Sequence, residues 1–206
     1  MSSWSFGAVA GLGVFHGINP AMGWLFAVAI GFRERTRTAV LAALGPIALG
    51  HAASMAATLL VFDELQVALP ARAVRIAGAL ALLAFATARL SRDRHPRWVG
   101  MNLTRAELAG WSFLMSTAHG AGLMLIPVVS RLPVAAHGGT MMGSSLLLDG
   151  VAVAVHTAAM IVVAAAVALV VYRFVGVGIL RRGWLNLDRV WTYALGAGAV
   201  VTLLAG

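Results

Sequence analysis

The sequence predicts an all-α integral membrane protein with six transmembrane helices, arranged as an inverted repeat of three helices plus three. Three observations support this fold class. Of the 206 residues, 61% are hydrophobic and only 11% are charged, and the mean hydropathy is +0.91. The apolar runs approach or exceed the ~20 residues that an α-helix needs to cross the hydrocarbon core. Two histidine-bearing segments of the first half also recur in the second half at nearly the same spacing.

The predicted spans cover residues 6–31, 39–62, 68–90, 109–130, 146–172 and 189–206. Arg72 and Arg75 fall at the start of the third segment, and the sixth is the shortest. Because these segments leave no room for a separate soluble domain, we expect residues 1–206 to form a single transmembrane domain. Repeat one then covers about 6–90 and repeat two about 109–206. The first residues lack the features of a secretory signal peptide, so we expect the first helix to be retained.

Four histidines mark the repeat. His16 and His119 are each followed by glycine, and His51 and His156 lie in the next apolar segment along. The spacing is 35 positions from His16 to His51 and 37 from His119 to His156. With an odd number of helices per repeat, the second copy enters the bilayer from the opposite side, which is the plan of many secondary transporters. At 1.5 Å of rise per residue, all four histidines fall near the midplane.

The arginines predict the orientation. All 15 basic residues are arginine, and the first, third and fifth loops hold 12 of them. The positive-inside rule places these loops in the cytoplasm, so both termini of this multi-pass protein face away from the cytoplasm across the plasma membrane. We therefore interpret the net charge of +8 as a topology signal and expect no nucleic-acid partner.

Polar residues inside the apolar segments form the candidate site. Polar groups at membrane depth are costly, so they commonly mark a substrate or ion pathway. Asn19 and Pro20 predict a helix break beside His16 that frees backbone carbonyl groups. His51 and His156 each have a methionine four residues on, so each pair faces one side of its helix. The predicted metal ligands are His16, His51, His119, His156, Met22, Met55 and Met160. The predicted substrate pathway adds Gly17, Asn19, Pro20, Ser54, Thr117, Gly120, Asp149 and Thr157.

The residue types limit the chemistry. The chain has no cysteine, so metal ligands must come from histidine, methionine, asparagine or carboxylate. Imidazole with thioether suits Cu(I), Zn(II), Ni(II) and Co(II), whereas Ca(II) and Mg(II) prefer oxygen. Each element also has a simpler interpretation. Buried histidines join helices by hydrogen bonds, methionines fill cores and glycines allow close helix packing. Asp149 is either an entry-site carboxylate or a solvated interfacial residue.

The block HGINPAM, residues 16–22, resembles the H-x4-D-H signature of the NicO nickel/cobalt transporters in the LysE-type superfamily of inverted three-helix repeats. Residues 49–54, LGHAAS, are similar to the Gly-His-Ser block of that family. The resemblance implies that His16 matches the first signature histidine and His51 the later one. Ala21 stands in place of the aspartate and Met22 in place of the second histidine. These departures favour softer metals or an uncharged substrate over nickel and cobalt.

We expect a secondary transporter, not an enzyme, that moves a transition-metal cation (Ni, Co, Zn or Cu) by alternating access and holds no permanent cofactor. The chain has no nucleotide-binding loop, which argues against ATP-driven transport by this chain alone. The expected partners are the lipid bilayer and the metal ion or small solute, and the sequence leaves a homo-oligomer open. Two alternatives remain: a transporter or accessory membrane subunit for a small organic solute, and a membrane redox protein whose histidines ligate haem or a metal pair.

Overall fold

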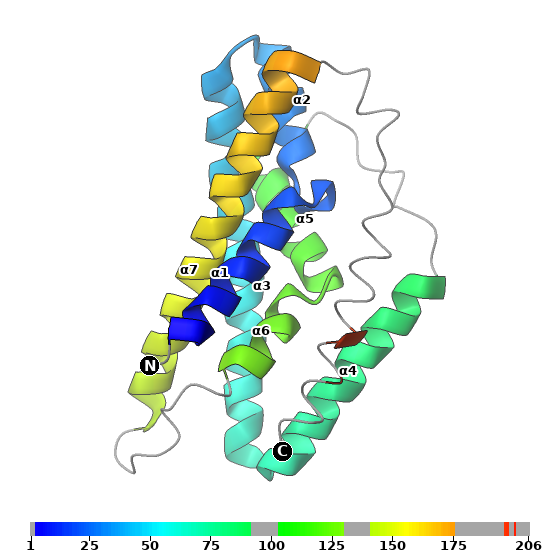
Figure 1. Cartoon of the computed structure of the whole chain (residues 1–206), viewed down its shortest axis with the longest axis vertical. Coiled ribbons are helices and arrows are strands. Elements are labelled where there is room, and N and C mark those ends of the chain that lie inside the picture. Colours follow the sequence, from blue (N-terminus) through cyan, green and yellow to red (C-terminus); the bar gives the residue numbers. More distant parts are fainter. Residues whose placement is uncertain (1–2, 92–102, 130–140, 176–195, 198–199, 201–206) are drawn as a thin grey trace.

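The computed structural model describes residues 3–91, 103–129, 141–175, 196, 197 and 200, and every regular element in that part of the chain is a helix (Figure 1). The predicted all-α class is therefore confirmed. The first half contains α1 (Ser3–Ile18), a 3-10 turn (Pro20–Met22), α2 (Trp24–Glu34), α3 (Arg37–Ala68) and α4 (Ala71–Ser91). The second half contains α5 (Arg105–Ala118), α6 (Ala121–Val129) and α7 (Met141–Val170), which continues into a π-helical turn (Val171–Val175).

Five of the six predicted apolar segments coincide with these helices. The second, third and fifth correspond to α3, α4 and α7. The first and fourth are each divided into two shorter helices, α1 with α2 and α5 with α6. The sixth segment, 189–206, lies outside the described residues except for positions 196, 197 and 200, which are helical. The two remaining histidines, His95 and His137, fall between the predicted segments and also lie outside the described residues.

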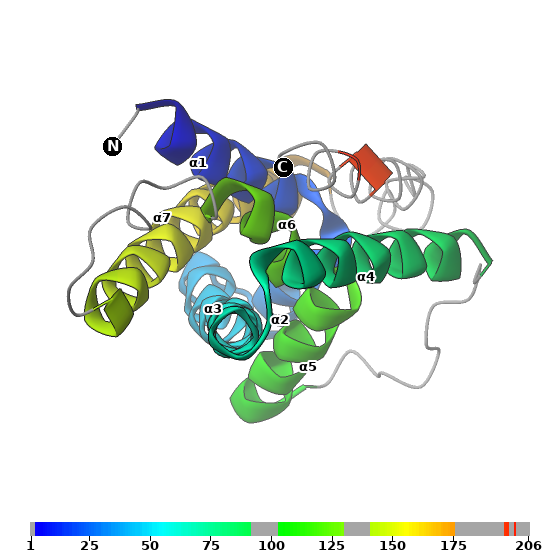
Figure 2. The same ribbon diagram turned by 90° about the horizontal axis from the view of Figure 1, so that it is seen from below.

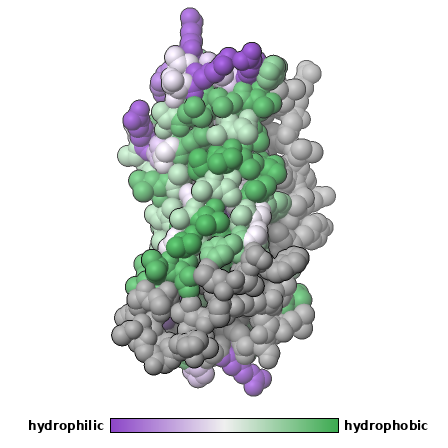
Figure 3. Space-filling model, turned by 60° about the vertical axis from the view of Figure 1, so that its left-hand side comes forward, coloured by the Kyte–Doolittle hydropathy of each residue, from purple (hydrophilic) through white to green (hydrophobic). Residues whose placement is uncertain are grey.

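Among the residues that the structure describes, two helices are long and apolar enough to cross a membrane. They cover Arg37–Leu65 in α3 and Leu146–Phe174 in α7 with its π-helical turn, and each has 29 residues. At 1.5 Å per residue such a helix is about 44 Å long, which exceeds the ~30 Å hydrocarbon core. Hydrophobic residues cover the middle of the face shown in Figure 3, and hydrophilic residues gather at its two ends. Leu49, Leu147 and Val162 each expose more than 60% of their surface, which suits contact with lipid.

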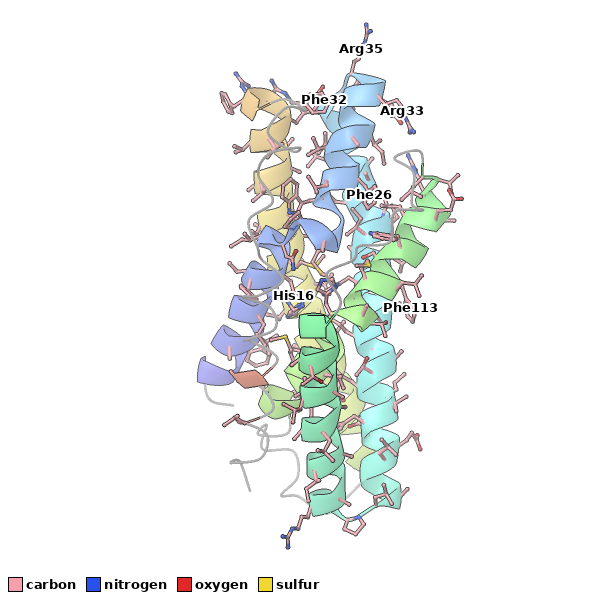
Figure 4. All side chains as sticks on the ribbon, turned by 90° about the vertical axis from the view of Figure 1, so that its right-hand side faces the viewer. His16, Phe26, Phe32, Arg33, Arg35 and Phe113 are labelled. Atoms are coloured by element: carbon pink, nitrogen blue, oxygen red, sulfur yellow. The ribbon has the colours of Figure 1, made fainter. Side chains whose placement is uncertain are left out.

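Arginines of the described part of the chain lie at both ends of the helix bundle. Figure 1 shows the α2–α3 connection and the end of α7 at one end, and the α3–α4 connection at the other. Arg33 and Arg35 extend from the first of these ends (Figure 4). Arg173 lies in the π-helical turn at that same end, whereas Arg72 begins α4 at the opposite end. The side of the membrane that each end faces stays a prediction.

Two helix pairs form the framework, and each combines one helix from either half of the chain. α1 packs most extensively against α7, and α5 packs most extensively against α3, as the end-on view in Figure 2 also shows. A methyl group added to Gly13 or Gly17 would overlap a backbone carbonyl oxygen of α7. Gly50 of α3 meets the carbonyl oxygen of Ala109 in α5 in the same way. Small residues thus let the paired backbones touch, as is common in membrane helices.

The buried apolar side chains form two main clusters, which we name by their position in Figure 1. The upper core consists of Trp24, Ala27, Val28, Val40, Ala43, Leu44, Ile47, Leu108, Met160, Ala164 and Ala168. The lower core consists of Val9, Met55, Leu59, Phe62, Ala121, Leu125, Ile126, Ala152 and Val153. Both cores draw residues from both halves of the chain. The candidate site lies between them.

Candidate functional site

Three imidazole rings from three different helices meet in the interior. The ring centroids are 4.8 Å apart for His16 and His156, 5.4 Å for His16 and His51, and 5.4 Å for His51 and His156. All three side chains are fully buried. His119, at the end of α5, is also fully buried and lies within electrostatic range of His16 and His51. The structure therefore brings the rings of His16, His51 and His156 together and buries His119 in the same region, and we call these four residues the histidine layer.

The histidine layer separates the two apolar cores. In the first segment, Val9 belongs to the lower core, Trp24 belongs to the upper core and His16 lies between them. In α3 the order runs the other way, from Ile47 in the upper core to Met55 in the lower core.

The second half of the chain repeats this arrangement. His119 lies between Leu108 of the upper core and Ala121 of the lower core. In α7, His156 lies between Val153 of the lower core and Met160 of the upper core. Four elements thus pass from one apolar core to the other at a histidine. Figure 4 shows His16 near mid-height of the bundle, far from the arginines at its end.

Three of the histidines are anchored through Nδ1 to backbone carbonyl oxygens. The Nδ1 atom lies 2.9 Å from the Leu12 oxygen in His16 and 2.7 Å from the Met115 oxygen in His119. His156 reaches across to α1, where its Nδ1 atom lies 3.2 Å from the Val9 oxygen. Because a carbonyl oxygen only accepts, each Nδ1 must carry the hydrogen. Histidines that bind metals commonly hold their second nitrogen in this way.

The layer also contains buried polar atoms that the described residues do not satisfy. Among the described residues, no hydrogen-bond partner is present for either ring nitrogen of His51 or for Nε2 of His156. Buried polar atoms are normally paired, because an unmade hydrogen bond in a low-dielectric interior is costly. Unused binding capacity is therefore present at the histidine layer.

The first helix break follows the prediction from Asn19 and Pro20. The Asn19 side chain caps the 3-10 turn, accepting a hydrogen bond from the Ala21 backbone N–H at 3.0 Å. Trp24 donates its indole N–H to the freed carbonyl oxygen of Ile18 at 3.2 Å. Gly23 then adopts φ of 107°, a left-handed conformation that favours glycine, and α2 begins. Sequence reasoning had not identified Trp24, whose signal is an indole donor placed just after a helix break.

The second helix break was not predicted. It falls directly after His119, where Gly120 adopts φ of 67°. His16 and His119 therefore occupy equivalent places: each bonds the carbonyl four residues back, and each lies at or just before the end of its helix. The available sequence signal was the repeated His-Gly pair, because glycine tolerates the left-handed turn that ends a helix.

The predicted methionine ligands lie beside the layer. Met55 belongs to the lower core and Met160 to the upper core, and both are fully buried. Each follows its histidine by one helical turn, so the two thioethers lie on opposite sides of the layer. Met22 is buried in the 3-10 turn.

Hydroxyl groups of the predicted pathway connect α3 with α5. The oxygens of Ser54 and Thr117 are 2.8 Å apart. Ser112, which was not predicted, adds a second link by donating its hydroxyl to the Ile47 carbonyl oxygen at 2.8 Å. Thr157 has a buried hydroxyl without a hydrogen-bond partner among the described residues. The same is true of Ser116, which sequence reasoning missed although it lies one turn before His119.

Asp149 is buried in the first half of α7, and its carboxyl group comes within hydrogen-bonding reach of the Asp63 carboxyl group of α3. This pair lies on the lower side of the histidine layer. Asp63 was not predicted, because it falls one residue beyond the expected end of the second segment. An acidic residue at the edge of an apolar run was the available signal.

The described part of the chain holds no group of three or more His, Asp or Glu side chains arranged to bind a metal ion as it stands. The ring spacing nevertheless suits one. Three imidazoles bound to one ion at about 2.0–2.1 Å have their ring centroids roughly 5 Å apart. Metal binding here thus requires the ring nitrogens to turn toward a common point. His51 can turn without breaking a hydrogen bond to any described residue.

Comparisons of this chain with protein-family models, with curated proteins and with solved structures found no match.

Proposed function

We propose that the protein is a secondary transporter that carries a transition-metal cation across the plasma membrane and holds it at the histidine layer. The observation that supports this best is the meeting of three imidazole rings, 4.8–5.4 Å apart, in a layer enclosed by apolar cores on both sides. Polar side chains at membrane depth are costly to bury and commonly mark a substrate or ion pathway, which favours a function for these four histidines.

The two cores fit the requirements of alternating access. A carrier holds its cargo near the middle of the membrane and keeps a barrier on each side. The upper core and the lower core supply these barriers, and the buried Asp149 lies on the lower side, close to Ala152 and Val153 along α7. To open the site to one side of the membrane, the helices need to separate at only one of the two cores.

The helix pairs suggest which parts move. His16 and His156 belong to the α1/α7 pair, which the His156 bond to Val9 also ties together. His51 belongs to α3 and His119 ends α5, so these two belong to the other pair. The cargo would then bind between two units, and rocking one unit against the other would open the upper or the lower core.

We further propose that the chain forms six spans as an inverted repeat with both termini outside. Support comes from matching features of the two halves: a broken first helix, an Nδ1 bond to the carbonyl four residues back, and a long second helix. The exchange α1 for α5 and α3 for α7 also turns one helix pair into the other.

Transport into proteoliposomes tests the proposal. Purified protein is reconstituted with a metal-sensitive dye inside the vesicles, and uptake of Cu, Zn, Ni and Co is measured for the parent, His16→Ala, His51→Ala and His156→Ala. We expect uptake to fall by at least about 100-fold in each variant, since losing an outer-shell partner of a ligand already costs about 10- to 100-fold. Leu49→Ala, an exposed position of α3, is the matched control and should transport normally. Uptake at the parental rate in all three histidine variants contradicts the proposal.

A small organic solute is the second candidate cargo. The finding that favours it is the absence of a ready-made metal-binding group among the described residues. A neutral solute with its own donors and acceptors could use the same nitrogens of His51 and His156. In that case metal uptake stays at the level of empty vesicles for the parent as well as the variants.

A further inference from the structure

We infer that the cargo is a soft monovalent cation of the Cu(I) class and not a divalent metal ion. This inference rests on the proposed function of the histidine layer and concerns the charge and chemical class of the ion. Three observations carry it: a ligand set without negative charge, an apolar enclosure, and a thioether on each side of the layer.

The ligand set is neutral when the imidazoles are unprotonated. Of the described acidic residues, Asp149 lies closest to the layer along its own helix, seven residues before His156 and thus about 10 Å away along the helix axis. Its carboxyl group faces Asp63 of α3. Asp63 and Glu107 are each 12 residues from the histidine of their segment and Glu64 is 13, or about 18–20 Å of helix rise. Glu34 is exposed at the end of the bundle. No described carboxylate therefore lies in the layer.

The charge of the ion determines how costly its transfer into this buried layer is. The cost of moving an ion from water into a low-dielectric interior rises with the square of its charge, so a divalent ion costs about four times as much as a monovalent ion of equal size. Catalytic zinc sites made of three histidines keep a fourth position for water. Here apolar side chains enclose the layer above and below. Neutral ligands in this enclosure can therefore stabilise a monovalent ion better than a divalent one.

The number and kind of ligands agree with this choice. Cu(I) is satisfied by two or three neutral nitrogen or sulfur ligands and requires no water or carboxylate to complete its shell. The rings of His16, His51 and His156 supply three nitrogens at suitable spacing. Imidazole and thioether are also ligands that copper accepts well.

Met55 and Met160 then gain a role in the path of the ion. They lie one helical turn from His51 and His156, in the lower and the upper core respectively. A Cu(I) ion leaving the imidazoles on either side would meet a thioether inside a core that is otherwise apolar. Zn(II) and Ni(II) would gain less from these thioethers, because softer ions bind thioether sulfur better. The thioethers thus provide successive binding steps that favour a soft ion.

Binding by the full chain in lipid nanodiscs tests the choice of cation. Cu(I) affinity is measured anaerobically by competition with a chromogenic chelator, and Zn(II), Ni(II) and Co(II) by equilibrium dialysis. We expect one Cu(I) per chain, with affinity at least about 100-fold lower in His51→Gln, and no binding of the divalent ions that depends on His51. Tighter binding of a divalent ion through His51 overturns the inference and leaves the proposed function in place. If no metal binds through His51, both are wrong.

Transport by methionine variants tests the thioether steps. Met55→Leu and Met160→Leu nearly conserve volume, so the cores should stay packed. We expect each to transport Cu(I) or Ag(I) about tenfold more slowly while equilibrium binding changes less than about threefold. Met124→Leu, a buried methionine of α6 outside both cores, is the matched control and should transport as the parent does. Parental rates in Met55→Leu and Met160→Leu would overturn the role of the thioethers.

Discussion

The imidazole rings of His16 and His156 meet edge to face, with centroids 4.8 Å apart and ring planes at 71°. Their helices can approach this closely because Gly13 and Gly17 leave room for the backbone of α7. The distance between two candidate ligands therefore depends on two glycines, whose lack of a side chain lets the helices touch. This relationship leads to the first prediction.

Replacing Gly17 with alanine should destabilise the protein by about 1–3 kcal/mol, because the added methyl group would overlap the Met160 carbonyl oxygen and approach Val163 Cβ to 2.8 Å. Thermal unfolding in detergent measures the change. Gly11→Ala in the same helix is the matched control, since a methyl group there has nothing within 4 Å. It should be neutral or stabilising by up to about 1 kcal/mol, because alanine favours helix over glycine. Equal losses in both variants would mean that α1 and α7 do not pack as described.

Trp24→Phe should cost about 1–3 kcal/mol, since it leaves the Ile18 carbonyl oxygen at the helix break without its indole donor. Trp111→Phe removes the same atoms, but the Trp111 indole N–H has no hydrogen-bond partner among the described residues. The phenylalanine ring in this variant can also keep the aromatic contact that Trp111 makes with Phe26. The unfolding free energies of the two variants should therefore differ by about 1 kcal/mol or more, and the prediction fails if Trp111→Phe is the less stable.

Asp149→Asn should stabilise the protein by on the order of 1 kcal/mol. The amide can donate a hydrogen bond to the neighbouring Asp63 carboxyl group and carries no charge of its own in the interior. Chemical unfolding in detergent measures the change. Glu64→Gln, an exposed neighbour in α3, is the control and should show little change. A loss of stability in Asp149→Asn larger than that in Glu64→Gln would contradict the pairing of Asp149 with Asp63.

Cysteine labelling can determine the orientation, because the chain has no native cysteine. Glu34→Cys lies at the α2–α3 connection and Leu69→Cys at the α3–α4 connection, at opposite ends of the bundle. We expect a membrane-impermeant thiol reagent added outside intact cells to label Leu69→Cys, and to label Glu34→Cys only after the cells are opened. The reverse pattern would invert the proposed topology. Labelling of both positions in intact cells would show that α3 does not span the membrane.

The order of helices along the chain could be read largely from local signals. Hydropathy located five apolar segments that prove to be helical, and Asn19 with Pro20 predicted the first break, because a proline removes a backbone donor wherever it stands. The same approach did not find the break at Gly120. A glycine between apolar residues is compatible with a continuous helix as well as with its end, and neighbouring helices decide between them.

The sequence by itself determined the helical class and nominated His16, His51, His119 and His156, because apolar content and repeated spacing are properties of neighbouring residues. Only the tertiary structure decided that three of these rings lie within 5.4 Å of one another and that the layer separates two apolar cores. It also paired Asp63 with Asp149. Such distances depend on how helices from opposite halves of the chain pack, and close packing is set by contacts such as that between Gly17 and Met160.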